Sequence, residues 1–445
     1  MSLTVINNTI MTNRKFFWPI TLLLFLLISS NANAQLTAKG LGLANAYTAS
    51  ARGIDSPYWN PANLGLPDSP QFTGIFFSTI ADFNNNSFSL KNYNHYNGSF
   101  WTQSDIENIL NKIPARGFQS ELNSSFKVLS FAVNHFAVTI GMEMNGFILF
   151  DKSFFDLALT GNELNKLYQI DNLNSGFLSY SSIGLSWGQG FKVPFADILS
   201  FGSTVKLLNG LGYANINKAN LLLDTNEQGF KINGNYEITR ALGSFGGTFN
   251  LGLAARFNNR WTVSLAVDNI VSSIGWSRDV KKEIGEVYGD SLIVLTLEDD
   301  EVNSIKDEID YNNTSFTSGN FKTSIPTVIR FGTLLQAGPF NFTADYYHKF
   351  RNESWRATIS QFSVGTEWHI FNILSLRSGL AYKDKDMMGT AFGIGMNIIG
   401  LTFDFGMMNY GKILPSTSKG VILAIEIGIN QDWRSSTKKR VLKKN

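Results

Sequence analysis

The chain has 445 residues, of which 16% are charged and 13% aromatic, and its formal net charge at neutral pH is +2. A typical soluble domain carries about 25% charged residues, whereas this composition is typical of membrane β-barrels, whose strands are apolar on one face only. Cysteine is absent, which excludes disulfides, thiol catalysis and cysteine-type metal sites. No nucleic-acid partner is expected.

The chain begins with the pattern of a secretory signal peptide. Arg14 and Lys15 form a positive region, an apolar run follows over residues 16–28, and Ala32-Asn33-Ala34 has the small-x-small pattern of a cleavage site. The apolar run is shorter than the roughly 20 residues that a spanning helix needs. Residues 1–34 are therefore predicted to be a cleaved signal peptide, and either Met1 or Met11 is the true start.

Residues 71–430 are predicted to form one antiparallel transmembrane β-barrel of about 14 strands, because short segments of alternating polarity follow one another between turn residues. The clearest strands are 327–335, 340–349, 362–369, 373–382, 390–397, 401–409 and 421–430. A hairpin is predicted at 249–257 and 261–270, across an Asn-rich turn. Weaker candidates are 72–79, 87–93, 126–133, 136–144, 177–187, 202–208, 214–223 and 230–238.

Three stretches interrupt the strand pattern and are placed in external loops. Residues 102–117 read as a short helix, with Ser104 as N-cap and Glu107 completing a capping box. Residues 153–168 also have helical spacing, and the charged stretch 280–320 contains a polar helix candidate at 299–310. Since barrels have short periplasmic turns and long external loops, these helices either cap the mouth or contact a substrate.

Alternation assigns the two faces of each predicted strand. Large apolar side chains share one face, while glycines and isolated charges share the other, which suits lipid outside and a polar lumen inside. Arg or Lys facing lipid at mid-bilayer would cost about 2–4 kcal/mol. The predicted lumen network, which either stiffens the barrel or lines a substrate path, consists of Arg330, Asp345, Glu367, Arg377, Asp404 and Glu426.

Residues 431–445 form a basic end that follows the last predicted strand. They carry six basic residues and one acid, Asp432. We expect a solvated periplasmic tail, with binding of a secretion-system or periplasmic protein as the alternative.

Residues 39–66 resemble the start of the long-chain fatty-acid transporter (FadL-type) superfamily of outer-membrane proteins. The shared features are a Gly-rich segment at 40–42, Ala46-Tyr47, and Asn60-Pro61-Ala62. The form Tyr58-Trp59-Asn60-Pro61-Ala62 is similar to the branch that includes the PorV and PorQ proteins of type IX secretion, as are Ser324–Gly332 and Val364–Trp368. The resemblance implies a 14-stranded barrel with residues 35–70 as a plug, or hatch, inside it. Trp59, Asn60, Pro61 and Ala62 are the expected gate.

Two functions from different classes follow from the resemblance. The first is passive uptake of a hydrophobic or detergent-like small molecule across the Gram-negative outer membrane, gated by the hatch. The second is a PorV-like barrel that does not transport and instead anchors or shuttles secretion cargo. An enzyme is not expected, because the four histidines lie on separate segments and no metalloprotease, phosphate-binding or serine-hydrolase motif is present. No cofactor or metal is predicted, and the barrel is expected to be a monomer surrounded by lipid.

Overall fold

The computed structural model describes residues 37–171, 173–227, 229–292, 309–350, 358–371, 373–383, 387–411 and 415–431. The expected signal peptide, most of the helix candidate at 299–310 and nearly all of the basic tail lie outside these residues. Those expectations stay predictions.

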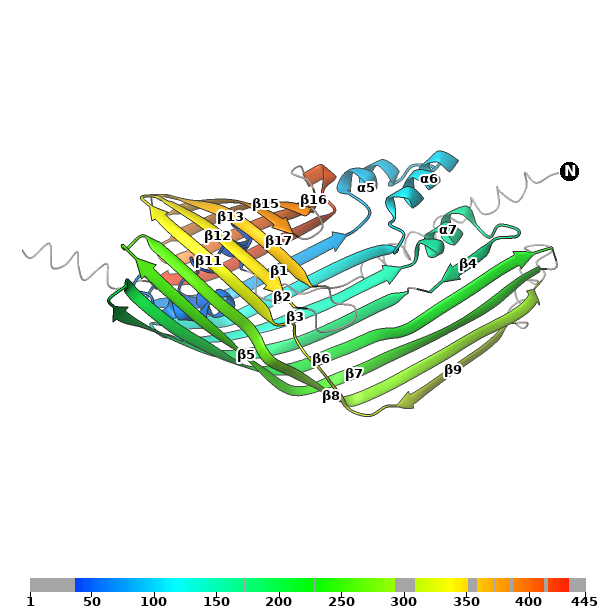
Figure 1. The fold of residues 1–445 in the computed structure, drawn as a ribbon, viewed down its shortest axis with the longest axis horizontal. Coiled ribbons are helices and arrows are strands. Elements are labelled where there is room, and N and C mark those ends of the chain that lie inside the picture. Colours follow the sequence, from blue (N-terminus) through cyan, green and yellow to red (C-terminus); the bar gives the residue numbers. More distant parts are fainter. Residues whose placement is uncertain are drawn as a thin grey trace, which may run out of the picture.

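Fourteen antiparallel strands close into a barrel, as the sequence predicts (Figure 1). Closure is made by β1, which pairs with β2 on one side and with β17 on the other. The barrel strands are β1 Phe72–Asn85, β2 Phe118–Val133, β3 Phe136–Phe150, β5 Asn174–Val193, β6 Ala196–Asn226, β7 Gly229–Phe257, β8 Trp261–Leu292, β11 Val328–Ala337, β12 Phe340–Lys349, β13 Ile359–Ile370, β14 Leu374–Lys383, β15 Met387–Ile398, β16 Leu401–Gly411 and β17 Gly420–Gln431.

The wall of the barrel is uneven in height. Strands β6, β7 and β8 have 31, 29 and 32 residues, whereas β11 to β17 have 10 to 12. The long strands therefore continue as a sheet beyond one end of the barrel (Figure 1). Three short strands pair with them: β4 Leu167–Ile170 with β6, and β9 Asp310–Thr317 and β10 Phe321–Thr323 with β8.

The prediction of separate strands at 202–208 and 214–223, and at 230–238 and 249–257, is wrong. The first two segments both belong to β6, and the last two both belong to β7. In each strand the register is irregular at the glycines between the two predicted segments. A Cβ atom on Gly210 would lie only 2.9 Å from the Cα of Gly243. These glycines allow two backbones to approach closely within the sheet, and they do not mark turns.

The helices between barrel strands are α5 Leu90–Tyr96, α6 Gln103–Lys112 and α7 Lys152–Thr160. Several predicted boundaries in these regions are wrong. The strand predicted at 87–93 is wrong, because Ser89 and Asn92 form a capping box that starts α5. Helix α6 is capped by Thr102 with Asp105, and not by Ser104 with Glu107. Helix α7 ends at Gly161, which has φ +83°, so residues 167–168 of the predicted helix lie in β4. Of the charged stretch 280–320, residues 280–292 belong to β8 and residues 310–317 to β9.

Short hairpin turns and long connections lie at opposite ends of the barrel. The turns use residues of positive φ, among them Asn134, Asn258 and Gly338. Helices α5, α6 and α7 lie at the other end, beside the sheet extension (Figure 1), near a 3-10 turn, η3 Pro415–Thr417. None of the helices in the described part of the chain has the length and apolar character to cross a membrane.

The two faces of the wall differ as the alternation predicts. Along β14, Leu376, Leu380 and Tyr382 are exposed on the outside, while Arg377 and Ala381 are buried inside. The same pattern along β17 exposes Val421, Leu423 and Ile425. The exterior is therefore apolar over most of the barrel, which is the surface that a bilayer requires.

Candidate functional site: the N-terminal segment in the lumen

Residues 37–71, here called the N-terminal segment, lie inside the barrel toward the end with the short turns (Figure 1). They form four short helical turns: α3 Ala38–Gly42, η1 Gly53–Asp55, α4 Ser56–Trp59 and η2 Pro61–Gly65. Thr37 caps α3 by accepting a hydrogen bond from the N–H of Gly40. Nearly every side chain in the segment is buried against the wall.

Glycines of the barrel wall lie directly against the N-terminal segment, and the set of these glycines is here called the glycine seat. A Cβ atom on Gly202 would be 2.3 Å from the backbone nitrogen of Ala62, and one on Gly406 would be 2.3 Å from the carbonyl oxygen of Ala38. Real Cβ atoms do not approach so closely, so no larger residue fits there without moving the segment. Wall glycines in equivalent positions are Gly188, Gly190, Gly252, Gly332, Gly365, Gly379 and Gly393.

The Asn60–Ala62 turn is tied to the wall by hydrogen bonds. The side-chain amide of Asn60 donates to the carbonyl oxygens of Leu253 (2.8 Å) and Leu265 (3.3 Å), and its oxygen accepts from the N–H of Ala62 (3.0 Å). Ser200 donates to the carbonyl oxygen of Ala62 at 2.6 Å. Pro61, which starts η2, has no N–H to satisfy. The predicted gate residues therefore lie in contact with β6, β7 and β8.

Trp59 is fully buried and is contacted by Arg330 of the wall. The guanidinium carbon lies 4.9 Å from the centroid of the indole ring and 4.9 Å from that of Tyr347. Arg330 also donates to Asp268 at 3.0 Å, and the indole N–H donates to Thr37. This cation–π contact joins the segment to the wall. Arg330 and Asp345, both predicted in the lumen network, are not paired with each other.

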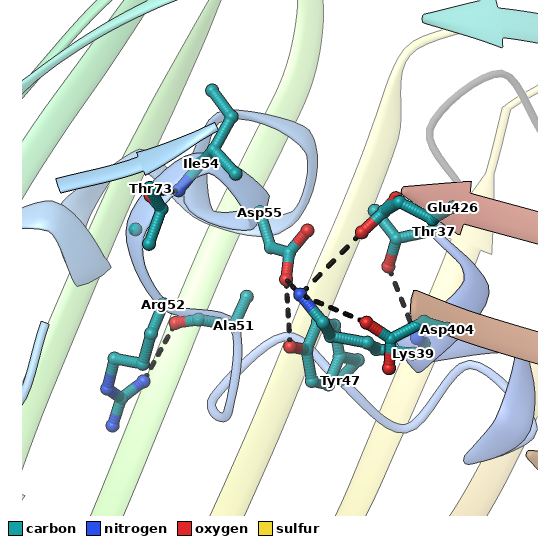
Figure 2. Close-up of polar contacts among 12 residues, drawn as sticks. Thr37, Lys39, Tyr47, Ala51, Arg52, Ile54, Asp55, Thr73, Asp404 and Glu426 are labelled. Carbon is teal, nitrogen blue, oxygen red and sulfur yellow. Dashed lines mark hydrogen bonds and ion pairs between the residues drawn. The ribbon is translucent and has the colours of Figure 1, made fainter. Parts of the chain in front are cut away.

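Lys39 lies at the centre of a charged cluster between the segment and strands β16 and β17 (Figure 2). Its ammonium nitrogen is 2.9 Å from Asp55, 3.6 Å from Glu426 and 3.8 Å from Asp404. The hydroxyl of Tyr47 donates to the same Asp55 oxygen at 3.1 Å. Burial alone would lower the pKa of Lys39, but Asp55, Asp404 and Glu426 raise that pKa well above its usual value. The ammonium therefore stays charged.

Two further groups of the predicted network complete this region. Arg377 donates to Glu367 and to Asp404, at 2.7 Å in each case. The carboxylate of Asp345 accepts from the backbone N–H groups of Tyr47 (3.0 Å) and Thr48 (2.7 Å). Of the six predicted network residues, the structure brings three together directly (Glu367, Arg377 and Asp404). Asp345, Glu426 and Arg330 contact the N-terminal segment.

At the other side of the lumen, Asp68 joins the segment to the wall. It contacts Arg52 of the segment and Arg256 of β7, at 2.9 Å in each case. Burial alone would raise the pKa of Asp68, but the two guanidinium groups outweigh it and hold that pKa below its usual value.

The sequence analysis missed the partners that the segment supplies to this wall. The segment contains only four charged residues, Lys39, Arg52, Asp55 and Asp68. Each of them forms an ion pair. The sequence does contain a signal for these contacts. Four charged residues in a stretch that is otherwise small and apolar indicate ion-pair partners in the barrel wall.

A small cavity lies in the lumen beside the segment. It has a volume of about 20 Å³ and lies between Tyr58 and the wall residues Lys127, Glu143, Lys206 and Asn269. Such a cavity holds about one water molecule. Toward the helical end, a buried apolar cluster on β5 to β8 includes Leu208, Ile274 and Trp276, against which Tyr213 and Phe321 pack. Within the described residues, no group of His, Asp and Glu is arranged to hold a metal ion.

Comparisons with known proteins agree with this architecture. Residues 61–244 match the model of a family of unknown function (DUF5723), and no curated protein matches the sequence. Among solved structures, a FadL homologue of Pseudomonas aeruginosa superposes with a TM-score of 0.53 at 12% identity, covering 91% of this chain and 99% of that one.

Two further structures are described as monoaromatic hydrocarbon channels. A TodX variant has a TM-score of 0.52 at 12% identity over 90% of this chain and 100% of its own. CymD has a TM-score of 0.51 at 9% identity over 90% of this chain and 99% of its own. At these identities the likeness shows the fold, which is that of the FadL-type barrels, and it does not single out the PorV/PorQ branch.

Proposed function

We propose that this chain is an outer-membrane channel for hydrophobic small molecules, closed by its N-terminal segment and opened when that segment moves. The signal peptide expected from the sequence, the apolar exterior and the fold of the FadL-type barrels support this proposal. Two barrels of similar fold carry monoaromatic hydrocarbons according to their descriptions. We infer the same broad class of cargo here, with the buried apolar cluster on β5 to β8 along its path.

One observation supports the gating part of the proposal: glycines on eight strands of the wall lie directly against the segment. The cavity between Tyr58 and the wall has room for about one water molecule, so a hydrocarbon needs the segment to shift before it can pass between Tyr58 and the wall. The contacts of the segment suit such a shift. Beside the apolar packing of residues such as Leu41 and Leu64, they include hydrogen bonds and ion pairs next to wall glycines, and such polar contacts can be exchanged for water when the segment leaves.

A reversible cross-link tests the channel and the gate together. The chain has no cysteine, so Leu43→Cys with Gly365→Cys creates a single pair. The Cβ atoms would start 3.0 Å apart, about half an ångström short of the usual disulfide range. We expect proteoliposomes to take up a hydrophobic probe when the pair is reduced and to lose uptake when it is oxidised. Because Gly365 lies against the segment, Gly365→Cys alone should already raise uptake, and this single variant is the baseline. Neither single-cysteine variant should respond to the oxidant.

The outcomes separate the two parts of the proposal. Absence of uptake in the reduced protein and in a variant that lacks residues 35–60 would remove the channel function. Uptake that oxidation leaves unchanged would show that the segment is not the gate.

A further inference from the structure

Two permanently charged cations, four carboxylates and the imidazole of His369, which lies 3.3 Å from Glu367, form one connected cluster where the N-terminal segment meets β13, β14, β16 and β17. The cations are Lys39 and Arg377, and the carboxylates are Asp55, Glu367, Asp404 and Glu426. All four carboxylate residues are buried. Because a buried charge without compensation is costly, this excess of acid over base needs an explanation.

Glu426 is the carboxylate with the poorest set of donors. Asp55 accepts hydrogen bonds from Lys39 and Tyr47, and the other two carboxylates accept from Arg377. The nearest cation to Glu426 is Lys39, whose nitrogen lies 3.6 Å away, beyond hydrogen-bond distance. The second carboxylate oxygen of Glu426 is buried and has no hydrogen-bond partner within the described part of the chain.

Like charges also surround Glu426. It lies directly opposite Asp404 in the register of β16 and β17, and like charges in opposed positions are destabilising. The charged and titratable groups that act on it come from every side: Lys39, Asp55 and Tyr58 of the segment, Asp404 of β16 and Lys127 of β2. Lys127 also interacts with Glu143, so including both gives five carboxylates, three permanently charged cations and one histidine.

We propose that Glu426 is a proton-binding site that couples the position of the N-terminal segment to pH. It carries a proton while the segment lies against β17, and it releases the proton when the segment moves away and water reaches the carboxylate. Lys39 cannot release the proton in its place, because the surrounding carboxylates raise the pKa of its ammonium group. The inference rests on the proposed function only in calling this movement the opening of a channel.

The sign of the coupling follows from proton counting. The docked state is the one in which the segment lies on the wall. It binds one proton more than the released state from above the usual ionisation range of a glutamic acid (about pH 4–5) up to the higher pH at which Glu426 ionises in the docked state. A state that binds more protons is favoured at lower pH. Docking is therefore strongest under mildly acidic conditions. Raising the pH weakens it by at most about tenfold per pH unit, the limit for one proton.

Hydrogen exchange of the backbone amides of residues 37–66, in protein reconstituted into lipid nanodiscs, tests this inference. After correction for the chemical exchange rate, protection in the native sequence should fall as the pH rises from 5.5 to 8.5. Glu426→Gln, which is neutral at every pH, should keep the low-pH protection throughout. Asp82→Asn is the matched control, because Asp82 is a buried wall carboxylate that bonds Asn123 outside the cluster. It should keep the native pH dependence.

Lys39→Met provides a second variant that separates titration from packing. Without the ammonium, protection should be lost at pH 7.5 and recovered at pH 5, where protonation neutralises the carboxylates. A loss that acid does not reverse would overturn the proposal, and so would native pH dependence in Glu426→Gln or protection in the native protein that does not vary with pH. No transported compound is involved, so a failed uptake assay would leave this inference standing.

Discussion

The indole ring of Trp59 lies against the guanidinium group of Arg330, with the guanidinium carbon 4.9 Å from the ring centroid. Arg330 is itself held by Asp268 at 3.0 Å, so a wall ion pair positions the cation that contacts the N-terminal segment. A lysine has no planar group to stack on the indole ring or on Tyr347. The side chain at position 330 therefore affects the wall and the segment together.

Arg330→Met should release the segment and destabilise the barrel. It removes the stacking cation and leaves the buried Asp268 without its guanidinium partner, at a cost of about 3–5 kcal/mol. Limited proteolysis of the segment and urea unfolding in detergent measure the two effects. The double variant Arg330→Met with Asp268→Asn is the control, and it should regain much of the stability while the segment stays loose. Equal losses in both variants would contradict this account.

Gly202→Ala should displace the segment without unfolding the barrel. The added methyl group would lie 2.3 Å from the backbone of Ala62, so the Asn60–Ala62 turn must move. We expect greater protease access to the segment and faster uptake of a hydrophobic probe. Gly212→Ala on the same strand is the control, because its nearest contact would be an ordinary 3.4 Å from Phe177. If the two variants behave alike, the glycine seat is not what positions the segment.

Asn60→Ala should weaken docking by roughly 1–3 kcal/mol, since it removes two hydrogen bonds to the wall and the cap on Ala62. Asn60→Asp restores the capping oxygen but cannot donate to Leu253 or Leu265. It also buries a charge, so it should be no better than alanine. Hydrogen exchange of the segment ranks the three proteins. Native-like protection in Asn60→Asp would show that capping alone holds the turn.

Acid should loosen the segment near Asp68 in a lower pH range than the one that concerns Glu426. The guanidinium groups of Arg52 and Arg256 lower the pKa of Asp68. The contribution of this carboxylate is therefore present above its unfolded value, about 3.9, and is lost as the pH falls through the lowered pKa. Exchange of residues 66–70 should rise below about pH 4 in the native protein. Asp68→Asn should show fast exchange at neutral pH already and little further change.

Thr102→Ala should unfold the start of α6, while Ser104→Ala should not. The Thr102 hydroxyl accepts a hydrogen bond from the N–H of Asp105, and the Asp105 carboxylate accepts from the N–H of Thr102. The side chain of Ser104 has no comparable capping role in the structure. Amide exchange in residues 103–107 should become several-fold faster in the first variant only. The reverse result would restore the cap that the sequence predicts.

The sequence predicts the wall of the barrel better than its contents. Strands β11 to β17 follow from alternation, because a charged side chain facing lipid is so unfavourable that Arg377 and Asp404 must turn inward. Strands β6 and β7 do not follow as well, because Gly210 and Gly243 look like turn residues and instead mark a close approach of two strands. Local patterns cannot distinguish these two uses of glycine.

The contacts of the lumen could not be predicted from alternation at all. Alternation predicts that Glu426 faces inward. It does not predict that Lys39 lies beside Glu426, because the position of Lys39 depends on the path of an irregular segment through the barrel. The sequence analysis assigned the N-cap of α6 to the wrong residue for a simpler reason. Thr102-x-x-Asp105 and Ser104-x-x-Glu107 both have capping spacing, and the choice between them depends on where the chain leaves the loop.

The glycine seat has a consequence for the order of assembly. Its members come from β5 to β7, from β11 and from β13 to β16, strands that lie far apart in the chain. They are held around one lumen once β1 has paired with β17. Contacts between such distant parts of a chain form late, because the entropy of closing a long loop must be overcome first. We therefore expect the N-terminal segment, although it is synthesised before any strand, to reach its final place only after the barrel has closed.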